Sequence, residues 1–237
     1  MATKNKTCNI LGIAGSLRRE SYNRSALRAA TKLAPPGARI EVFELDGIPS
    51  FNQDDEQHPP ARVVELKRRI RAADGLLFVT PEYNWSIPGV LKNAIDWASR
   101  PHGDSAWDGK PAAIIGASTG AIGTARAQCH LRQVLVYLNV YAINQPEVLI
   151  GNAFERFDAQ GNLRDETSKT LIRQLLQNLM DYAERHGPAV DRARASPPLA
   201  APGALPLPAS EAERIIEERP KIPAAYEKNF EKYLGHQ

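Results

Sequence analysis

Residues 9–14 read Asn9-Ile10-Leu11-Gly12-Ile13-Ala14, a short and nearly continuous apolar run. Runs of this kind are typical of strands that are buried on both faces, as in parallel sheets. A polar loop from Gly15 to Tyr22 follows, and residues 23–33 then place apolar side chains at helical spacing. The start of the chain therefore predicts a buried strand, a loop and a helix.

The same alternation continues along the chain. Further strands are predicted at 39–45, 75–80, 111–117 and 140–150, and further helices at 61–73, 88–99, 123–138 and 166–185, with a long loop at 46–60. Alternation of strands and helices predicts an α/β fold, a parallel sheet with helices on both faces. Because crossovers are right-handed, few topologies remain, and we expect five strands in the order 2-1-3-4-5. Ligands of such sheets bind beyond the carboxyl ends of the strands.

Composition narrows the class of protein. The chain has 237 residues, a net charge of +3 and 24% charged residues, typical of a globular protein without a nucleic-acid surface. No segment approaches the roughly 18 apolar residues of a membrane span. Met1 to Lys6 carry no apolar signal core, and Cys8 and Cys129 are too few for a disulfide framework. We therefore expect a cytoplasmic protein.

The proline content changes near residue 187. Residues 1–187 are expected to form one domain, and residues 188–237 a Pro-rich linker with short helical stretches, because prolines recur between 188 and 208.

The first loop of interest, Gly15 to Asn23, leads directly into a helix. A helix N-terminus offers free N–H groups and partial positive charge, which suit a phosphate. Ser16, Ser21 and Asn23 can add hydrogen bonds, and Arg18 a charge-assisted one. The alternative is that Ser21 or Asn23 only caps the helix. The loop has neither a G-x-G-x-x-G pattern nor a P-loop lysine, which argues against those NAD and ATP sites.

Two more loops follow predicted strands at the same edge. The third loop, residues 80–89, carries Tyr83 and Trp85, and a flat heteroaromatic ligand would explain two aromatic residues there. The alternative is a tight turn whose aromatic rings pack on the core or on another subunit. The fourth loop, residues 117–123, is rich in small residues, which let a backbone approach a ligand closely, although a plain turn has the same composition.

Taken together, these loops resemble the NAD(P)H-dependent FMN reductase family, which includes bacterial quinone and chromate reductases. The motifs that carry the resemblance are Gly15-Ser16-Leu17-Arg18 with Ser21-Tyr22-Asn23, and Pro81-Glu82-Tyr83-Asn84 with Ser86, Pro88-Gly89, Leu91-Lys92-Asn93-Ala94 and Ile95-Asp96-Trp97. The resemblance covers roughly the first 185 residues, the size of one domain. It implies a flavodoxin-like fold with FMN (flavin mononucleotide) bound non-covalently.

The resemblance also implies a role for each loop. Residues that would hold the FMN phosphate are Ser16, Arg18, Ser21 and Asn23. Residues that would border the ribityl chain and the isoalloxazine are Pro81, Glu82, Tyr83 and Asn84, and those that would close the other side of the ring are Ser118, Thr119 and Gly120. The family further implies a homodimer or homotetramer in which Arg126 and Glu147 help join subunits, with Cys129 standing where relatives have an aromatic residue.

The implied reaction moves a hydride from NAD(P)H through flavin N5 to quinones, azo compounds, flavins or metal oxyanions such as chromate. No catalytic acid or base is predicted, because the flavin carries the chemistry. One alternative is a flavodoxin-type electron carrier without NAD(P)H turnover, which the net charge of +3 and Arg18 argue against. The other is a non-enzymatic interaction protein on the same fold.

Overall fold

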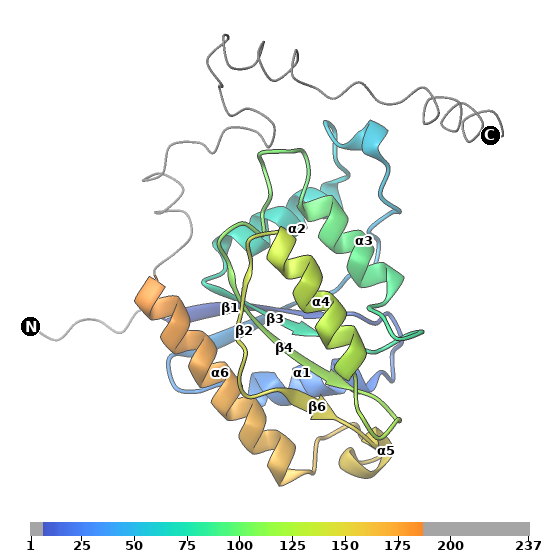
Figure 1. Cartoon of the computed structure of the whole chain (residues 1–237), viewed down its shortest axis with the longest axis vertical. Helices are drawn as coiled ribbons and strands as arrows, with labels where there is room; N and C mark the ends of the chain where they lie inside the picture. The colour runs from blue at the N-terminus through green and yellow to red at the C-terminus, as the bar shows by residue number, and fades with distance from the viewer. Residues whose placement is uncertain (1–6, 187–237) are drawn as a thin grey trace, which may run out of the picture. The chain divides into compact units, whose positions relative to one another are not determined.

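The computed structural model describes residues 7–186, shown in colour in Figure 1. The predicted extension at 188–237 lies outside these residues. Within them, no helix combines the length and the apolar character needed to cross a bilayer.

A parallel sheet forms the centre of this part of the chain. Its strands are β1 (Cys8–Ala14), β2 (Ala38–Phe43), β3 (Gly75–Val79), β4 (Pro111–Ala117), β5 (Tyr141–Ala142) and β6 (Val148–Ile150). The strand order is β2-β1-β3-β4-β5, and β6 also pairs with β4. Every pairing is parallel. The predicted α/β class and the order 2-1-3-4-5 are therefore confirmed.

The prediction of one continuous strand at 140–150 is wrong. The segment forms two short strands, and both lie beside β4: Ala112 pairs with Ala142, and Ile115 pairs with Val148. The Ile143 N–H still donates to the carbonyl of Ala112 at 2.8 Å, and residues 144–147 lie outside the ladder. Pro146 lies in this gap, and proline has no N–H to donate to a neighbouring strand. The edge of the sheet is thus built in two pieces.

Helices fill the connections between strands. They are α1 (Tyr22–Lys32), α2 (Ala61–Ala72), α3 (Gly89–Ala98), α4 (Ala125–Tyr137), α5 (Ala153–Arg156) and α6 (Glu166–His186), with a 3-10 turn η1 (Gln53–Asp55) inside the long loop. The four predicted helices at 61–73, 88–99, 123–138 and 166–185 agree with the structure to within a few residues. Neither η1 nor α5 was predicted, because single turns carry no periodic apolar pattern.

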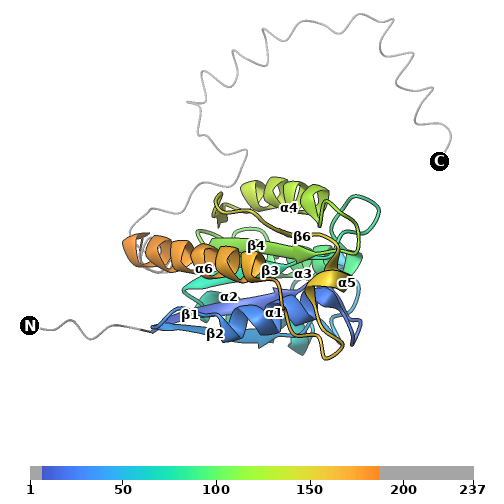
Figure 2. The same ribbon diagram turned by 90° about the horizontal axis from the view of Figure 1, so that it is seen from below.

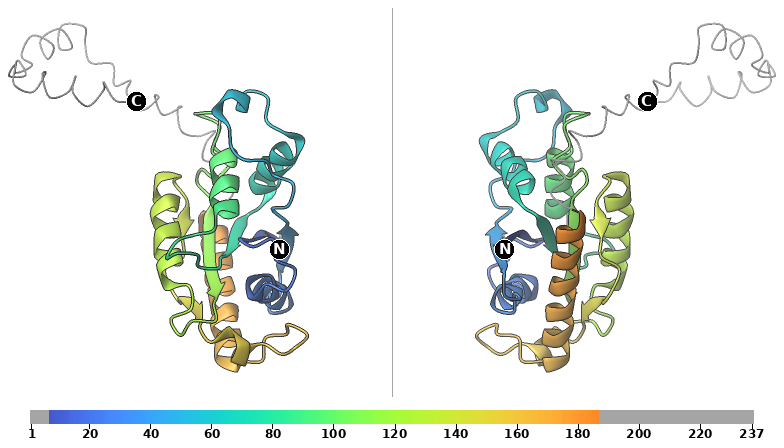
Figure 3. Two further views of the ribbon diagram at one scale, coloured as in Figure 1. Left: turned by 90° about the vertical axis from the view of Figure 1, so that its right-hand side faces the viewer. Right: turned by 90° about the vertical axis from the view of Figure 1, so that its left-hand side faces the viewer.

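The core has two halves, one on each face of the sheet. Apolar side chains of α1 and α6, such as Leu27 and Leu176, pack on one face. Side chains of α2, α3 and α4, such as Leu66, Leu91 and Leu131, pack on the other. Figures 2 and 3 show this layering, with α1 and α4 on opposite sides of the sheet. Strands covered on both faces explain the solid apolar runs in the sequence.

Candidate functional site

The first, third and fourth loops leave neighbouring strands at one edge of the sheet. The N–H of Gly15 donates to the carbonyl of Val79 at 2.9 Å, and the N–H of Thr80 donates to the carbonyl of Ile115 at 3.0 Å. These bonds join the ends of β1, β3 and β4 side by side. We call the three loops together the rim. It lies at the point where the strand order reverses, between β1 and β3.

The first loop ends in a capped helix. Ser21 is the N-cap of α1, and its Oγ accepts a hydrogen bond from the Asn23 N–H at 3.2 Å. Ser16 is buried, and its Oγ accepts from the Arg18 N–H at 3.3 Å. No acidic residue lies in the first turn of α1. The capping interpretation of Ser21 thus holds, and the helix N-terminus keeps its positive end facing the loop.

Arg18 is one of two neighbouring arginines in this loop. Its side chain is exposed, and no carboxylate within residues 7–186 pairs with it. The N–H groups of Leu17, Arg19 and Glu20 likewise have no acceptor among the described residues. Free backbone donors beside an unpaired guanidinium at a helix N-terminus form an arrangement that suits a phosphate.

Asn23 has a structural task that the sequence did not reveal. Its Nδ2 donates to the carbonyl of Ala117 at 2.8 Å, and its Oδ1 accepts from the N–H of Ala117 at 2.9 Å. The side chain is 3% exposed, and this pair of bonds ties the start of α1 to the end of β4. Asn23 therefore aligns the first and fourth loops with each other.

The third loop contains a tight hairpin. Tyr83 and Ser86 exchange two backbone hydrogen bonds of 3.0 Å, and the two residues between them have positive φ, 51° at Asn84 and 65° at Trp85. Positive φ at both central positions defines a type I′ turn, in which Asn-Gly is preferred. A tryptophan in this conformation is strained, at a cost of roughly 1–2 kcal/mol. The surrounding bonds hold it there.

Glu82 connects this hairpin to α4. Its side chain is 11% exposed and lies 4.0 Å from Arg126 Nη1. Its Oε2 accepts from the N–H of Ala127 at 3.0 Å, so that the carboxylate caps the start of α4. Ser86 Oγ also lies 2.7 Å from Nδ1 of His130 on the same helix. These contacts of Glu82 and Ser86 fix the third loop to α4. Pro81, near the start of the loop, is buried.

The aromatic side chains of the third loop face outward. Trp85 is 70% exposed and Tyr83 is 52% exposed. The Arg126 guanidinium lies 4.3 Å above the Trp85 ring. The alternative in which these rings pack on the protein's own core does not hold in this chain. Large aromatic rings that are exposed at the edge of the sheet where ligands bind offer a surface on which a planar molecule can stack.

The fourth loop completes the rim. Ser118 Oγ accepts from the N–H of Gly120 at 3.2 Å, and the carbonyl of Gly120 accepts from the N–H of Asn152 at 3.1 Å. Thr119 and Gly120 are exposed. The start of α5 therefore supports this loop from behind and leaves its outer surface to face the other two loops.

Several contacts of the site were not predicted from the sequence. The stack of Arg126 on Trp85 and the contact of His130 with Ser86 join residues more than forty positions apart, which no local motif reveals. Arg126 was predicted to act with Glu147 between subunits, but within the chain it lies against Glu82 and Trp85. Among residues 7–186, no cluster of His, Cys, Asp or Glu has the geometry of a metal site.

Comparison with known proteins identifies the family. The model of the family described as NADPH-dependent FMN reductase matches residues 8–155. An NAD(P)H-dependent FMN reductase of Pseudomonas aeruginosa is 56% identical over 178 residues, which cover 74% of this chain and 95% of the relative. A 2-hydroxy-1,4-benzoquinone reductase of a Burkholderia species is 50% identical over 169 residues, covering 71% of this chain and 90% of the relative.

A solved structure shares the fold. FerB, a flavoenzyme NAD(P)H:(acceptor) oxidoreductase from Paracoccus denitrificans, is 37% identical and matches with a TM-score of 0.70, over 76% of this chain and 98% of FerB. The flavodoxin-like fold predicted from the sequence is thereby confirmed. A family match over more than half of the chain, together with relatives this similar, settles the assignment: the chain belongs to the NADPH-dependent FMN reductase family.

Proposed function

We propose that this protein is an oxidoreductase that binds FMN non-covalently at the rim and reduces quinones with NAD(P)H. The observation that carries the proposal is the rim itself, where a helix N-terminus with an unpaired arginine and exposed aromatic side chains meet at one edge of the sheet. A ligand with a phosphate at one end and a planar ring at the other fits this distribution of charge and apolar surface.

The first loop would hold the phosphate. The free N–H groups of residues 17, 19 and 20 and the guanidinium of Arg18 would donate to the phosphate oxygens, with the hydroxyls of Ser16 and Ser21 at the base of the loop. Asn23 uses both ends of its amide on Ala117, so its contribution is to position the loop, with one remaining N–H available to the ligand.

The third and fourth loops would hold the ring. Backbone groups of Pro81, Glu82, Tyr83 and Asn84 border one edge, and Ser118, Thr119 and Gly120 border the other. The Glu82 carboxylate accepts a hydrogen bond at the N-terminus of α4. We therefore assign the Glu82 side chain a positioning role and its backbone the contact with the ring. The exposed Tyr83 gives an incoming planar substrate a surface for stacking.

FMN, when bound, supplies the chemistry that accepts a hydride from NAD(P)H and passes electrons to a second substrate. The protein's own task is to hold the ring at an open edge, to offer hydrogen bonds along it and to stack substrates against it. The quinol takes up a further proton beyond the transferred hydride, and we assign no acid or base of the rim to this step.

Quinones are the acceptor class best supported, since the Burkholderia relative is named as a benzoquinone reductase and a relative from Arabidopsis thaliana, 43% identical over 185 residues, as an NADPH:quinone oxidoreductase. Azo compounds, free flavins and chromate belong to the same proposal as further acceptors of an exposed ring. NAD(P)H-linked chemistry is consistent with the cytoplasmic location that we propose.

We also propose that the protein works as a homodimer or homotetramer. Trp85 of the rim and Arg126 on α4 form an exposed stacked pair. This pair offers a contact for a second copy of the chain. Glu147 is exposed and has no partner within residues 7–186, so it is available to such a contact, while Cys129 on α4 is exposed as well.

Reconstitution of the purified full-length chain with FMN tests the proposal. We expect a yellow protein that retains stoichiometric FMN after gel filtration. A chain that stays colourless after refolding in excess FMN would refute cofactor binding and favour a non-enzymatic interaction protein. A yellow protein whose flavin is not reduced by NADPH or NADH would favour the electron-carrier alternative.

A further inference from the structure

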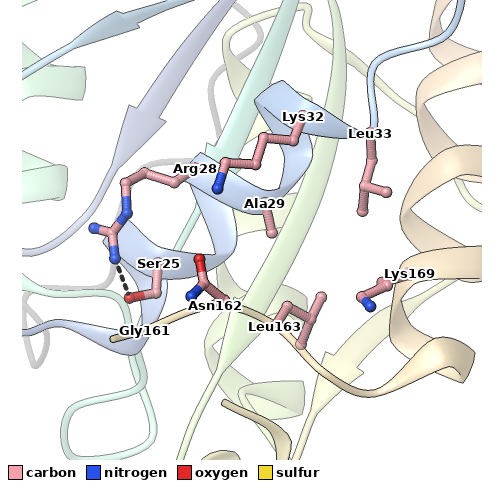
Figure 4. Close-up of a pocket in the computed structure, with 9 residues that line it drawn as sticks. All are labelled: Ser25, Arg28, Ala29, Lys32, Leu33, Gly161, Asn162, Leu163 and Lys169. Carbon is pink, nitrogen blue, oxygen red and sulfur yellow. Dashed lines mark hydrogen bonds between the residues drawn. The ribbon is translucent and has the colours of Figure 1, made fainter. Parts of the chain in front are cut away.

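A pocket lined by no rim residue lies between α1, α6 and the turn that connects α5 with α6 (Figure 4). Its volume is about 210 Å³. The charged side chains that line it are Arg28 and Lys32 from α1 and Lys169 from α6, and no carboxylate lines it. Nothing in the proposed reaction uses this pocket, because none of the residues that line it belongs to the rim.

The positive charge of the pocket is only partly neutralised. Lys169 Nζ pairs with the exposed Glu166 at 2.7 Å. The Arg28 guanidinium donates to the Ser25 hydroxyl at 2.8 Å but meets no carboxylate. The Lys32 side chain makes no hydrogen bond or ion pair with any described residue. The carboxyl end of α1 favours a cation at this position but supplies no counter-ion. Two of three cations therefore remain available to an anion.

One wall of the pocket is a turn with fixed geometry. The Asp158 carboxylate accepts from the N–H groups of Gln160 at 3.0 Å and Asn162 at 2.8 Å. Gly161 has a φ of +73°, and a Cβ on it would lie 2.7 Å from both Arg28 Nη2 and Ser25 Oγ. The turn thus lies directly against Arg28, and its positive φ at position 161 favours glycine.

The floor of the pocket is apolar. It is formed by Ala29, Leu33 and Leu163, and Leu163 is 5% exposed. Figure 4 shows Leu163 between Asn162 and Lys169, opposite the Ala29 side of α1. Cavities of about 150 Å³ with aliphatic walls accept benzene, so a pocket of about 210 Å³ has room for one ring and a small substituent.

We propose that this pocket binds a small aromatic carboxylate of a single ring. The ring lies on Ala29, Leu33 and Leu163, and the carboxylate lies between Arg28 and Lys32. Charge alone would select any anion, and the apolar floor alone would select any hydrocarbon. The combination selects a molecule with both.

Calorimetric titration of the FMN-loaded full-length protein tests this site, with benzoate as the probe and acetate as a probe of equal charge without a ring. Benzoate is expected to bind at millimolar or lower concentration, and acetate roughly tenfold or more weakly. Absence of benzoate binding, or equal affinity for both probes, overturns the proposal.

Variants locate the binding. Lys32→Glu reverses a charge at an exposed position and is expected to weaken benzoate roughly tenfold or more. Ala29→Leu fills the floor without changing any charge and is expected to weaken benzoate while leaving acetate unchanged. Arg68→Glu, at an exposed position of α2 on the other face of the sheet, is the matched control and should leave benzoate affinity as it is.

Binding over the flavin is the competing outcome. Benzoate on the ring would change the visible absorption spectrum of bound FMN, and Lys32→Glu would leave its affinity unchanged. Either of these results refutes the pocket as the binding site. An unchanged flavin spectrum together with lost affinity in Lys32→Glu and Ala29→Leu is the result that we expect.

Discussion

Arg18 and Lys110 show how the surroundings of a cation decide its role. Arg18 is exposed, has no carboxylate partner among residues 7–186 and stands in the loop before α1. Lys110 is 3% exposed, and its Nζ donates to the carbonyls of Arg71 at 2.9 Å and Ala73 at 2.6 Å, at the end of α2. The first cation is available to a ligand, whereas the second satisfies the end of a helix.

Arg18→Ala is expected to weaken FMN binding by roughly 1.5–3 kcal/mol, the value of a hydrogen bond to a charged group. That loss corresponds to about one to two orders of magnitude in the dissociation constant. Quenching of FMN fluorescence during titration of the apoprotein measures it. Arg19→Ala, which removes the neighbouring exposed arginine, is the control and should lose less. An unchanged dissociation constant for Arg18→Ala would rule out its contact with the phosphate.

Lys110 predicts a pH dependence of stability. The pKa of Lys110 is lowered from 10.5 to about 8, mainly by burial, with Asp74 opposing the shift and nearby Arg71 adding to it. Below pH 8 the lysine is protonated in both states, so its contribution does not change with pH. Between about 8 and 10.5 the unfolded chain binds more protons, and the free energy of unfolding should therefore rise with pH.

Urea denaturation at several pH values between 8 and 10 measures this rise. Lys110→Met keeps most of the side-chain volume and removes the titrating group, so its free energy of unfolding should rise less over the same interval. Equal slopes in the two proteins would show that Lys110 does not titrate in this range.

At the scale of elements, the third loop and α4 behave as one unit. Glu82 caps α4 through Ala127, Ser86 contacts His130, and Arg126 stacks on Trp85. These contacts hold a hairpin whose turn residues, Asn84 and Trp85, both have positive φ. The neighbouring contacts maintain the strained conformation of Trp85, and this conformation keeps a large ring exposed at the rim.

This strain can be measured with two substitutions at one position. Trp85→Ala and Trp85→Gly both lose the stack on Arg126, but only glycine adopts positive φ without strain. Trp85→Gly is expected to be more stable than Trp85→Ala by about 1 kcal/mol. Chemical denaturation of the two apoproteins gives the difference. Equal stabilities would mean that the turn relaxes when the tryptophan is removed, and that the ring itself imposes the positive φ.

The sequence predicted most elements because their apolar periodicity is local. Strands covered on both faces appear as solid runs, and helices as spaced stripes, so the order of strands followed. The break in the last strand at Pro146 was missed, since apolar residues continue on both sides of it. The bonds between Asn23 and Ala117 could not be predicted either, because residues 94 positions apart share no local pattern.

At the scale of the whole molecule, all three loops of the rim lie within residues 7–186. The match with FerB covers 98% of that protein within 76% of this chain, and the predicted extension at 188–237 lies outside the described residues. The roles of the eleven predicted site residues in FMN binding stay predictions, although the structure brings all of them to three adjoining loops.

Truncation after Gly187 tests whether the predicted first domain, residues 1–187, suffices for the site. We expect the truncated protein to bind FMN with a dissociation constant within about twofold of that of the full chain, since no rim residue is removed. Fluorescence titration of the two apoproteins side by side measures this. Loss of FMN binding from a truncated protein that remains folded would place part of the site in residues 188–237.

The most direct test of the account is anaerobic mixing of the FMN-loaded protein with NADPH, followed by benzoquinone, while the visible absorbance of the flavin is recorded. If the rim binds FMN and passes electrons from NADPH to a quinone, the absorbance falls on addition of NADPH and returns on addition of benzoquinone. Bound flavin that neither NADPH nor NADH bleaches, or that benzoquinone does not reoxidise, would contradict the account.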